Sequence, residues 1–138
     1  YTINEVRDKI INGAAAIGVI YSGEYLYWQD ENEDLEYVIP KEGTNIWYDG
    51  WVITKGSENV ENAHKWIDFL CSQEAAYDNF EYIYYGTPNI AAQELIDEDI
   101  INNPGVFPDE ETIEKCEVYN YLGEEAEDMY YELWKKVK

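Results

Sequence analysis

One carboxylate lies between two indole side chains in the segment TNIWYDGWVI, residues 44–53. The segment alternates large apolar residues with other types, which predicts a β-strand over residues 44–54. Successive strand side chains point to opposite faces, so Trp47, Asp49 and Trp51 are expected to share one face. Aromatic ring faces attract ammonium groups and a carboxylate neutralises them, so the pattern is typical of a site for an organic cation.

The composition of the chain favours the same chemistry. Among 138 residues, 30 acidic residues outnumber 9 basic ones, which gives a formal net charge of −21, and 14 residues are tyrosine and 5 are tryptophan. So much negative charge repels nucleic acid and anionic membrane surfaces and attracts cations. Most of the acids have the plainer role of a solvated, solubilising surface. The chain contains no apolar run of roughly 20 residues, the length that spans a membrane.

The sequence patterns of common enzymes and metal sites are missing. His64 is the only histidine, so a histidine-based catalytic set has no second member, and glycine-rich nucleotide-binding and nucleophile-elbow motifs are absent. Cys71 and Cys116 lack the paired spacing of zinc ligands. Residues 30–34 begin like a calcium-binding loop, but Leu35 stands where that loop requires glycine. We therefore predict no enzyme activity, no metal site and no cofactor.

Strands and helices are predicted to alternate along the chain. Segments rich in β-branched and aromatic residues predict three strands, at residues 14–21, 35–40 and 44–54. Helical spacing of apolar residues, together with capping residues, predicts helices within residues 2–13, 24–29, 56–83 (two helices), from about 90, after Asp109 and from 124. The last helix carries an apolar stripe, interpreted as core: Ala126, Met129, Tyr130, Leu133, Trp134 and Val137. This alternation of strands and helices indicates an α/β fold.

Several aromatic residues fall at the ends of these predicted elements. Tyr21 stands where a strand stops, Trp47 and Asp49 lie in the strand described first, and Tyr84 and Tyr85 precede a turn. Ligands of open α/β sheets bind at the carboxyl ends of strands, so these residues are candidates for a binding site. The alternative is that the aromatic residues fill a core, as large apolar side chains usually do.

Four segments resemble the spermidine/putrescine-binding proteins of bacterial ABC transporters: PKEGTNIWYDGWVI, NVENAHKWIDFLCSQEAA, YYGTPNIAAQELI and FPDEETIEKCEVYNYLGEEAEDMYYELWKKVK. Order and spacing match from about Gly18 to the C-terminus. The most specific parts are the PKEG turn before Trp-x-Asp and the Tyr-x-Thr-Pro-Asn segment. The resemblance implies the C-terminal portion of a two-lobed, type II periplasmic-binding-protein-like fold. It implies that residues 1–46 and 94–138 belong to the second lobe and residues 47–93 to the first.

The resemblance also implies a set of ligand-binding residues. Trp47 and Asp49 fall on the family's central pair, an indole against the methylene chain of the polyamine and a carboxylate on an ammonium group. Tyr85 falls on a tyrosine of the cleft, and Tyr21 stands where polyamine binders often have tryptophan. Tyr119 stands where some members have glutamine. Trp51 has no role in the family and is expected in the core.

These expectations define a function. The resemblance implies an extracytoplasmic binding component of an ABC importer, which captures spermidine or putrescine and delivers it to a membrane permease. Contact with the membrane would come through that permease, a lipid anchor or a fusion. Two alternatives stay open: a binder of another small solute on the same fold, and an acidic, aromatic-rich glycan-binding module, because aromatic platforms and paired acids suit sugars too.

Overall fold

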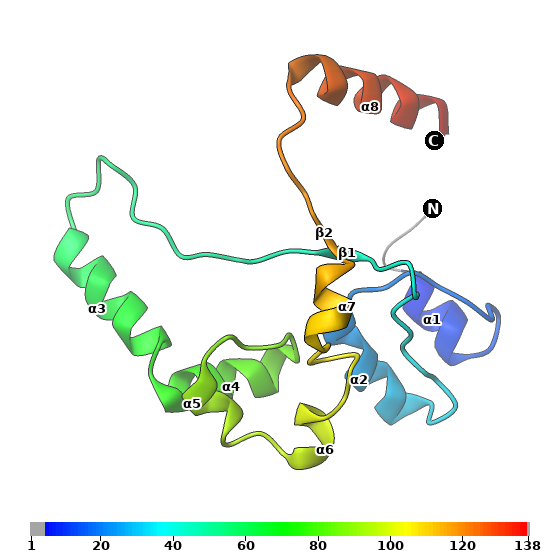
Figure 1. The fold of residues 1–138 in the computed structure, drawn as a ribbon, viewed down its shortest axis with the longest axis horizontal. Helices are drawn as coiled ribbons and strands as arrows, with labels where there is room; N and C mark the ends of the chain where they lie inside the picture. The colour runs from blue at the N-terminus through cyan, green and yellow to red at the C-terminus, as the bar shows by residue number, and fades with distance from the viewer. Residues whose placement is uncertain (1–4, 138) are drawn as a thin grey trace.

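Helices are the main regular structure in the computed structural model, which describes residues 5–137 (Figure 1). Their bounds are α1 Val6–Ile11, α2 Ser22–Glu31, α3 Val60–Leu70, α4 Gln73–Ile83, α5 Ile90–Gln93, α6 Glu98–Ile101, α7 Glu110–Glu114 and α8 Glu124–Val137. Two short strands, β1 Asn45–Ile46 and β2 Glu117–Val118, pair in parallel, with Asn45 opposite Glu117 and Ile46 opposite Val118.

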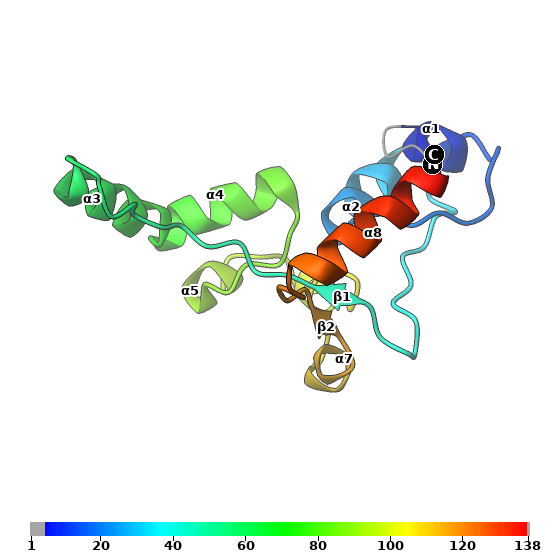
Figure 2. The same ribbon diagram turned by 90° about the horizontal axis from the view of Figure 1, so that it is seen from above.

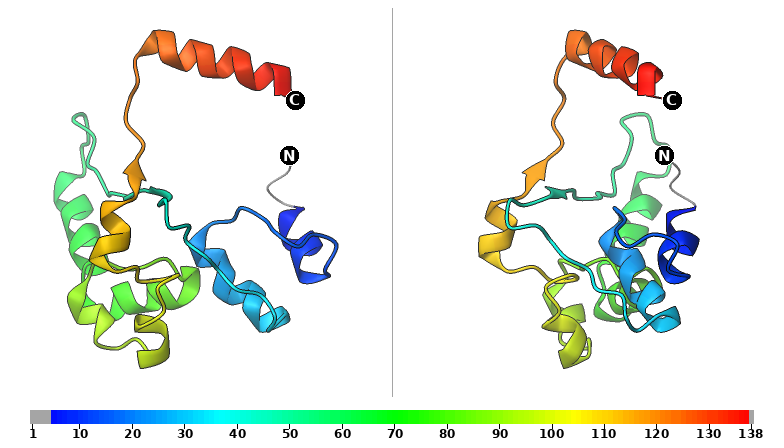
Figure 3. Two further views of the ribbon diagram at one scale, coloured as in Figure 1. Left: turned by 45° about the vertical axis from the view of Figure 1, so that its right-hand side comes forward. Right: turned by 90° about the vertical axis from the view of Figure 1, so that its right-hand side faces the viewer.

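The helices gather into two groups on either side of this strand pair. Helices α1 and α2 lie on one side, α3 to α5 lie on the other, and α7 lies beside β1 and β2 (Figures 1 and 2). Helix α8 stands apart from both groups, at the end of an extended link that follows β2 (Figure 3). The strand pair is therefore the place where distant parts of the chain meet.

A small apolar cluster joins α4 to the segment that follows it. Phe80 of α4 is 2% exposed and packs with Ile96 and Val106. Partly buried side chains surround this centre: Leu26, Tyr77, Tyr84, Ile100, Ile101 and Phe107. The cluster combines residues from all three predicted lobe segments, so the segment 47–93 does not pack independently of its neighbours. The lobe boundaries themselves stay a prediction.

The close approach of β1 to β2 depends on Gly43 in the PKEG turn. This glycine has a φ of +92°, a backbone conformation that L side chains rarely adopt, and a Cβ atom here would overlap the carbonyl oxygen of Lys115. The amide of Glu117 donates to the Thr44 carbonyl oxygen at 2.9 Å immediately beyond the turn. Glycine at position 43 thus allows the chain to begin pairing with β2.

The predicted strands are mostly wrong as regular structure. Residues 14–21 and 35–40 form no strand, and the segment predicted as a strand over 44–54 pairs only at Asn45 and Ile46. Ile17 and Val19 are 89% and 95% exposed, so the first of these segments is not buried either. A high content of β-branched residues indicates a fit to a pleated surface, but a strand also needs a neighbour for its backbone hydrogen bonds, and none pairs with these segments within residues 5–137.

Most predicted helices are confirmed, and side-chain caps explain where several begin. The Asp109 carboxylate accepts a hydrogen bond from the Thr112 amide at 2.8 Å, as predicted for the start of α7. Ser72 and Asn89 cap α4 and α5 in the same way. The capping residue predicted at the start of the first helix lies outside the described residues, in which α1 begins at Val6.

Helix α8 is confirmed as a helix, but its interpretation as core is wrong. Met129, Leu133 and Trp134 are about half exposed, at 55%, 48% and 50%. The spacing of the apolar residues determines which of them share a helix face, and it does not determine what covers that face. The stripe is an exposed apolar surface in the described part of the chain.

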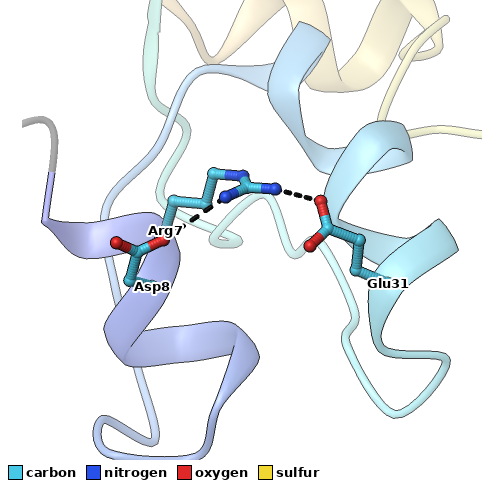
Figure 4. A network of polar contacts seen from close by, with 3 residues as sticks. All are labelled: Arg7, Asp8 and Glu31. Carbon is cyan, nitrogen blue, oxygen red and sulfur yellow. Dashed lines mark hydrogen bonds and ion pairs between the residues drawn. The ribbon is translucent and has the colours of Figure 1, made fainter.

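A polar contact joins α1 to α2 on the surface. The Arg7 guanidinium lies between Asp8, at 3.3 Å, and Glu31 of α2 (Figure 4). The side-chain amide of Asn32 also donates to the Ile11 carbonyl oxygen at 2.9 Å. Exposed ion pairs contribute little free energy, so this contact orients the two helices more than it stabilises them.

Replacing Phe80 by alanine is expected to lower the free energy of unfolding by about 3–5 kcal/mol, because it empties the centre of the apolar cluster. The matched control is Phe69→Ala on α3, where the ring is 55% exposed and contacts Trp66 at 5.6 Å between centroids. The control should cost less than about 1 kcal/mol. Urea unfolding of both variants measures the difference, and equal losses would contradict the assignment of the core.

Candidate functional site

Three aromatic rings from distant parts of the chain meet at Trp47. The Trp47 ring contacts the Tyr21 ring at 5.5 Å between centroids and the Tyr85 ring at 5.8 Å, with interplanar angles of 76° and 68°. Both are edge-to-face arrangements, which aromatic pairs prefer because the positive ring edge meets the negative ring face. Trp47 remains 37% exposed, so the contacts leave part of the indole accessible.

Each of these rings is placed by the end of an element. Tyr21 occupies the N-cap position of α2, and Trp47 follows β1 directly. Tyr85 follows Tyr84, which is the C-cap of α4. The strand pair β1–β2 therefore fixes the central ring, while the ends of two helices bring the others to it.

An open cavity of about 1000 Å³ surrounds the three rings. Its lining includes all five residues for which the sequence predicts a binding role: Tyr21, Trp47, Asp49, Tyr85 and Tyr119. Asp49 is the only charged side chain among the described residues of the lining. The arrangement offers a cation one carboxylate beside several aromatic rings, and the binding role of each residue stays a prediction.

The strand argument for Trp47, Asp49 and Trp51 is wrong, although the first two residues still line the cavity. Residues 47–53 are not a strand, so no alternating faces exist there. Asp49 is exposed, and Trp51 is 69% exposed, not part of a core. The carboxylate of Asp49 is therefore open to solvent in this structure, and the prediction that Trp51 lies in the core is wrong.

Tyr119 joins the site from β2. It follows this strand by one residue and lines the cavity, although its side chain is 80% exposed. A side chain that lines the cavity and is this exposed lies at the rim of the cavity.

The sequence analysis did not identify several polar side chains that also line the cavity: Tyr37, Asn79, Thr87 and Gln93. The amide of Gln93 donates to the Thr87 carbonyl oxygen at 2.7 Å, and the amide of Asn89 donates to the Cys71 carbonyl oxygen at 2.8 Å. The first bond joins the Tyr-Gly-Thr-Pro-Asn segment to α5, and the second joins it to the C-cap of α3. These four residues come from different parts of the chain and meet only in the folded structure, so neither periodicity nor spacing identifies them.

The environment of Tyr85 is apolar and negative. Burial raises the pKa of the Tyr85 phenol above its ordinary value of 10.0, and the carboxylate of Glu24 adds to the shift, with smaller contributions from Tyr21, Tyr37 and Asp49. Each of these effects disfavours a negative charge on the phenol. Only the contribution of the carboxylates distinguishes the sign of a charge, and it disfavours an anion at this ring.

A family model described as "Bacterial extracellular solute-binding protein" matches residues 2–108. Because this match spans most of the chain, the protein belongs to the family of bacterial extracellular solute-binding proteins.

Individual relatives give the same result in more detail. The chain is 34% identical over 128 residues to the spermidine/putrescine-binding periplasmic protein of Salmonella typhimurium, covering 93% of this chain and 36% of that protein. It is 29% identical over 135 residues to a putrescine-binding periplasmic protein of Pseudomonas aeruginosa, covering 94% of this chain and 37% of that protein. The chain thus spans little more than a third of the length of these relatives.

Two solved structures share the fold. A putative spermidine/putrescine ABC transporter protein from Listeria monocytogenes superposes with a TM-score of 0.82 at 41% identity. The spermidine/putrescine ABC transporter substrate-binding protein from Streptococcus pneumoniae gives 0.85 at 36% identity. Each match covers 96% of this chain and 41% of the other. The expected α/β fold of periplasmic binding proteins is confirmed, and the shares covered are consistent with the predicted C-terminal portion.

None of the helices within residues 5–137 is both long and apolar enough to span a membrane. No group of three or more histidine, cysteine or acidic side chains in the same part of the chain is arranged to hold a metal ion.

The raised pKa of Tyr85 predicts its behaviour in alkali. The folded state favours the neutral phenol, so this stabilisation is fully present below pH 10.0 and is lost as the pH rises through the raised pKa. NMR titration of ring-labelled tyrosine should show Tyr85 ionising above 10.0, with Tyr85→Phe identifying its signal. Ionisation of that signal at or below 10.0 would show that the ring is solvated.

Proposed function

We propose that the protein carrying this chain is the polyamine-binding component of an ABC importer and binds spermidine or putrescine outside the cytoplasm. The observation that supports this most is the placement of Asp49, the only charged side chain of the described cavity lining, two residues from the central indole of three aromatic rings. A polyamine alternates methylene groups with ammonium groups. It therefore needs an apolar surface and a carboxylate at short spacing.

Each residue has a role in this proposal. The exposed part of Trp47 packs along the methylene chain, while Tyr21 and Tyr85 hold the indole from two sides. Asp49 accepts charge-assisted hydrogen bonds from an ammonium group. Ring faces add cation–π attraction to the same group. All of these roles are non-covalent, so the proposed activity is binding and not catalysis.

In this proposal the protein has a membrane permease as its partner. Residues 1–46 and 94–138 would form part of one lobe and residues 47–93 part of the other, with the ligand between them. Closure of the lobes by hinge motion would then present the loaded form to a membrane permease. The family described as extracellular solute-binding proteins, and relatives named as periplasmic, support a location outside the cytoplasm.

Calorimetric titration of the protein with spermidine, putrescine and a neutral sugar tests this proposal. Binding of a polyamine that weakens as the ionic strength rises is the expected result, because the attraction between the ligand and Asp49 is screened by salt. Binding of the sugar alone, with no dependence on salt, would favour the glycan-binding alternative and refute the proposal.

Two variants separate charge from ring contact in the same titration. Asp49→Asn keeps the shape and removes the charge, so affinity should fall roughly tenfold to a hundredfold, as expected for a charge-assisted contact of about 1.5–3 kcal/mol. Trp47→Leu should also weaken binding, by a cation–π contribution of about 0.5–2 kcal/mol and lost methylene contact. Only Asp49→Asn should flatten the dependence on salt. Unchanged spermidine affinity in folded Asp49→Asn protein would defeat the assignment of the site.

Tyr119 at the rim is expected to influence the choice between polyamines. Tyr119→Gln replaces a ring and one hydroxyl by an amide, which changes what meets the far end of the ligand. The ratio of the spermidine to the putrescine affinity should therefore change more than the affinity for putrescine itself. If both affinities move by the same factor, Tyr119 has no role in selectivity.

A further inference from the structure

Tyr84 has an unusual backbone conformation next to the site. Its φ of 54° and ψ of 19° place it in the left-handed region, and it is the only residue other than glycine with a positive φ among residues 5–137. A bulky side chain is rarely found there, because its Cβ atom crowds the following carbonyl oxygen. The surrounding structure must therefore hold Tyr84 in this conformation.

Contacts on both sides of Tyr84 provide that hold. Its amide donates to the Phe80 carbonyl oxygen at 2.7 Å and so ends α4. Its ring contacts the Tyr27 ring at 4.9 Å and the Phe80 ring at 5.9 Å between centroids, both edge-to-face. The Tyr27 hydroxyl also donates to the Tyr82 carbonyl oxygen. Helix α2 thus contacts the end of α4 through the ring and the hydroxyl of Tyr27.

The next residue is the site tyrosine, and α2 contacts it as well. A Cβ atom on Gly23 would lie 2.6 Å from both the Ile83 carbonyl oxygen and the Tyr85 ring. Glycine at this position therefore allows α2 to approach the end of α4 closely. Tyr85 in turn reaches Trp47 at 5.8 Å. The turn at Tyr84 therefore determines whether the Tyr85 ring lies against Trp47.

We propose that Tyr84 is a positioning residue for the aromatic site. Its left-handed conformation turns the chain at the end of α4 so that Tyr85 meets Trp47, and its ring between Tyr27 and Phe80 stabilises that turn. Tyr84 itself is absent from the residues that line the cavity. The part of this inference that concerns ligand affinity rests on the proposed function, while the part that concerns the ring contact does not.

Substitutions at position 84 separate the backbone from the ring. Valine is branched at Cβ and strongly disfavours a positive φ, whereas glycine adopts it freely but has no ring. We expect Tyr84→Val to lose the contact between the Trp47 and Tyr85 rings, observed as NMR cross-relaxation between them. Tyr84→Gly should keep more of this contact than Tyr84→Val, because glycine adopts the turn although it lacks the ring that stabilises it. The matched control is Tyr82→Val, because Tyr82 is 79% exposed and lies in α4 two residues earlier.

The affinity for spermidine should follow the ring contact. Tyr84→Val is expected to lower it about tenfold, because the Trp47 indole loses its contact with the Tyr85 ring. Tyr84→Gly should lower the affinity less than Tyr84→Val does, and Tyr82→Val should leave the affinity unchanged. In a Tyr85→Ala background, Tyr84→Val should change the affinity by less than about twofold, because a residue that acts through Tyr85 has nothing left to position.

Two results would overturn the inference: a persisting contact between Trp47 and Tyr85 in folded Tyr84→Val protein, or a full further loss of affinity when this substitution is added to Tyr85→Ala. If Tyr84→Val does not fold, Tyr84→Ala takes its place, because alanine also disfavours the left-handed region without branching at Cβ. If the unsubstituted protein binds no polyamine, the proposed function fails. The ring contact then still decides the role of Tyr84.

Discussion

The edge contacts of Trp47 with Tyr21 and Tyr85 are the interaction on which the rest of the site depends. They join the start of α2, the residue after β1 and the residue after the C-cap of α4, which are far apart in the sequence. Pairs of this kind add about 0.5–1.5 kcal/mol each beyond the burial of apolar surface. Because the core centred on Phe80 is small, contacts of this size are a substantial part of the free energy that keeps the two groups of helices together.

The helices could be predicted from the sequence because their signals are local. Asp109 caps α7 through a bond to a residue three positions away, and the apolar spacing of α3 and α4 lies within a few turns. The strands could not, because pairing depends on a distant neighbour: Asn45 and Ile46 have one in β2, whereas Ile17 and Val19 have none in the described structure. Local pattern and burial are separate properties, as the exposed stripe of α8 also shows.

The candidate site was predicted mainly through resemblance. The five residues named from it line one cavity, although the reason first given for placing Trp47 and Asp49 together, a shared strand face, does not hold. Tyr84 was a candidate for the lining and is not part of it, and the roles of Gly23 and Tyr84 could not be recognised in advance. The importance of Gly23 lies in an absent Cβ atom and that of Tyr84 in a φ angle, and neither leaves a pattern in the sequence.

The charge of the chain and the charge of the cavity act over different ranges. Thirty acidic residues against nine basic ones create a field that concentrates cations near the protein, and salt screens it over about 8 Å at physiological ionic strength. Inside the cavity a single carboxylate, Asp49, is present among the described lining residues. The acidic residues over the whole surface therefore attract cations of every kind. Selection among these cations depends on the position of the Asp49 carboxylate relative to the aromatic rings.

The missing side chain at Gly43 limits how this protein can diverge. Lys41 and Glu42 in the same turn are highly exposed, at 90% and 72% of their side chains, so evolution is free to replace them. At position 43 even one methyl group would overlap the Lys115 carbonyl oxygen and separate β1 from β2. Trp47 follows β1 directly, so its position depends on that of the strand. Packing therefore restricts position 43, four residues before the indole, far more than it restricts Lys41 and Glu42.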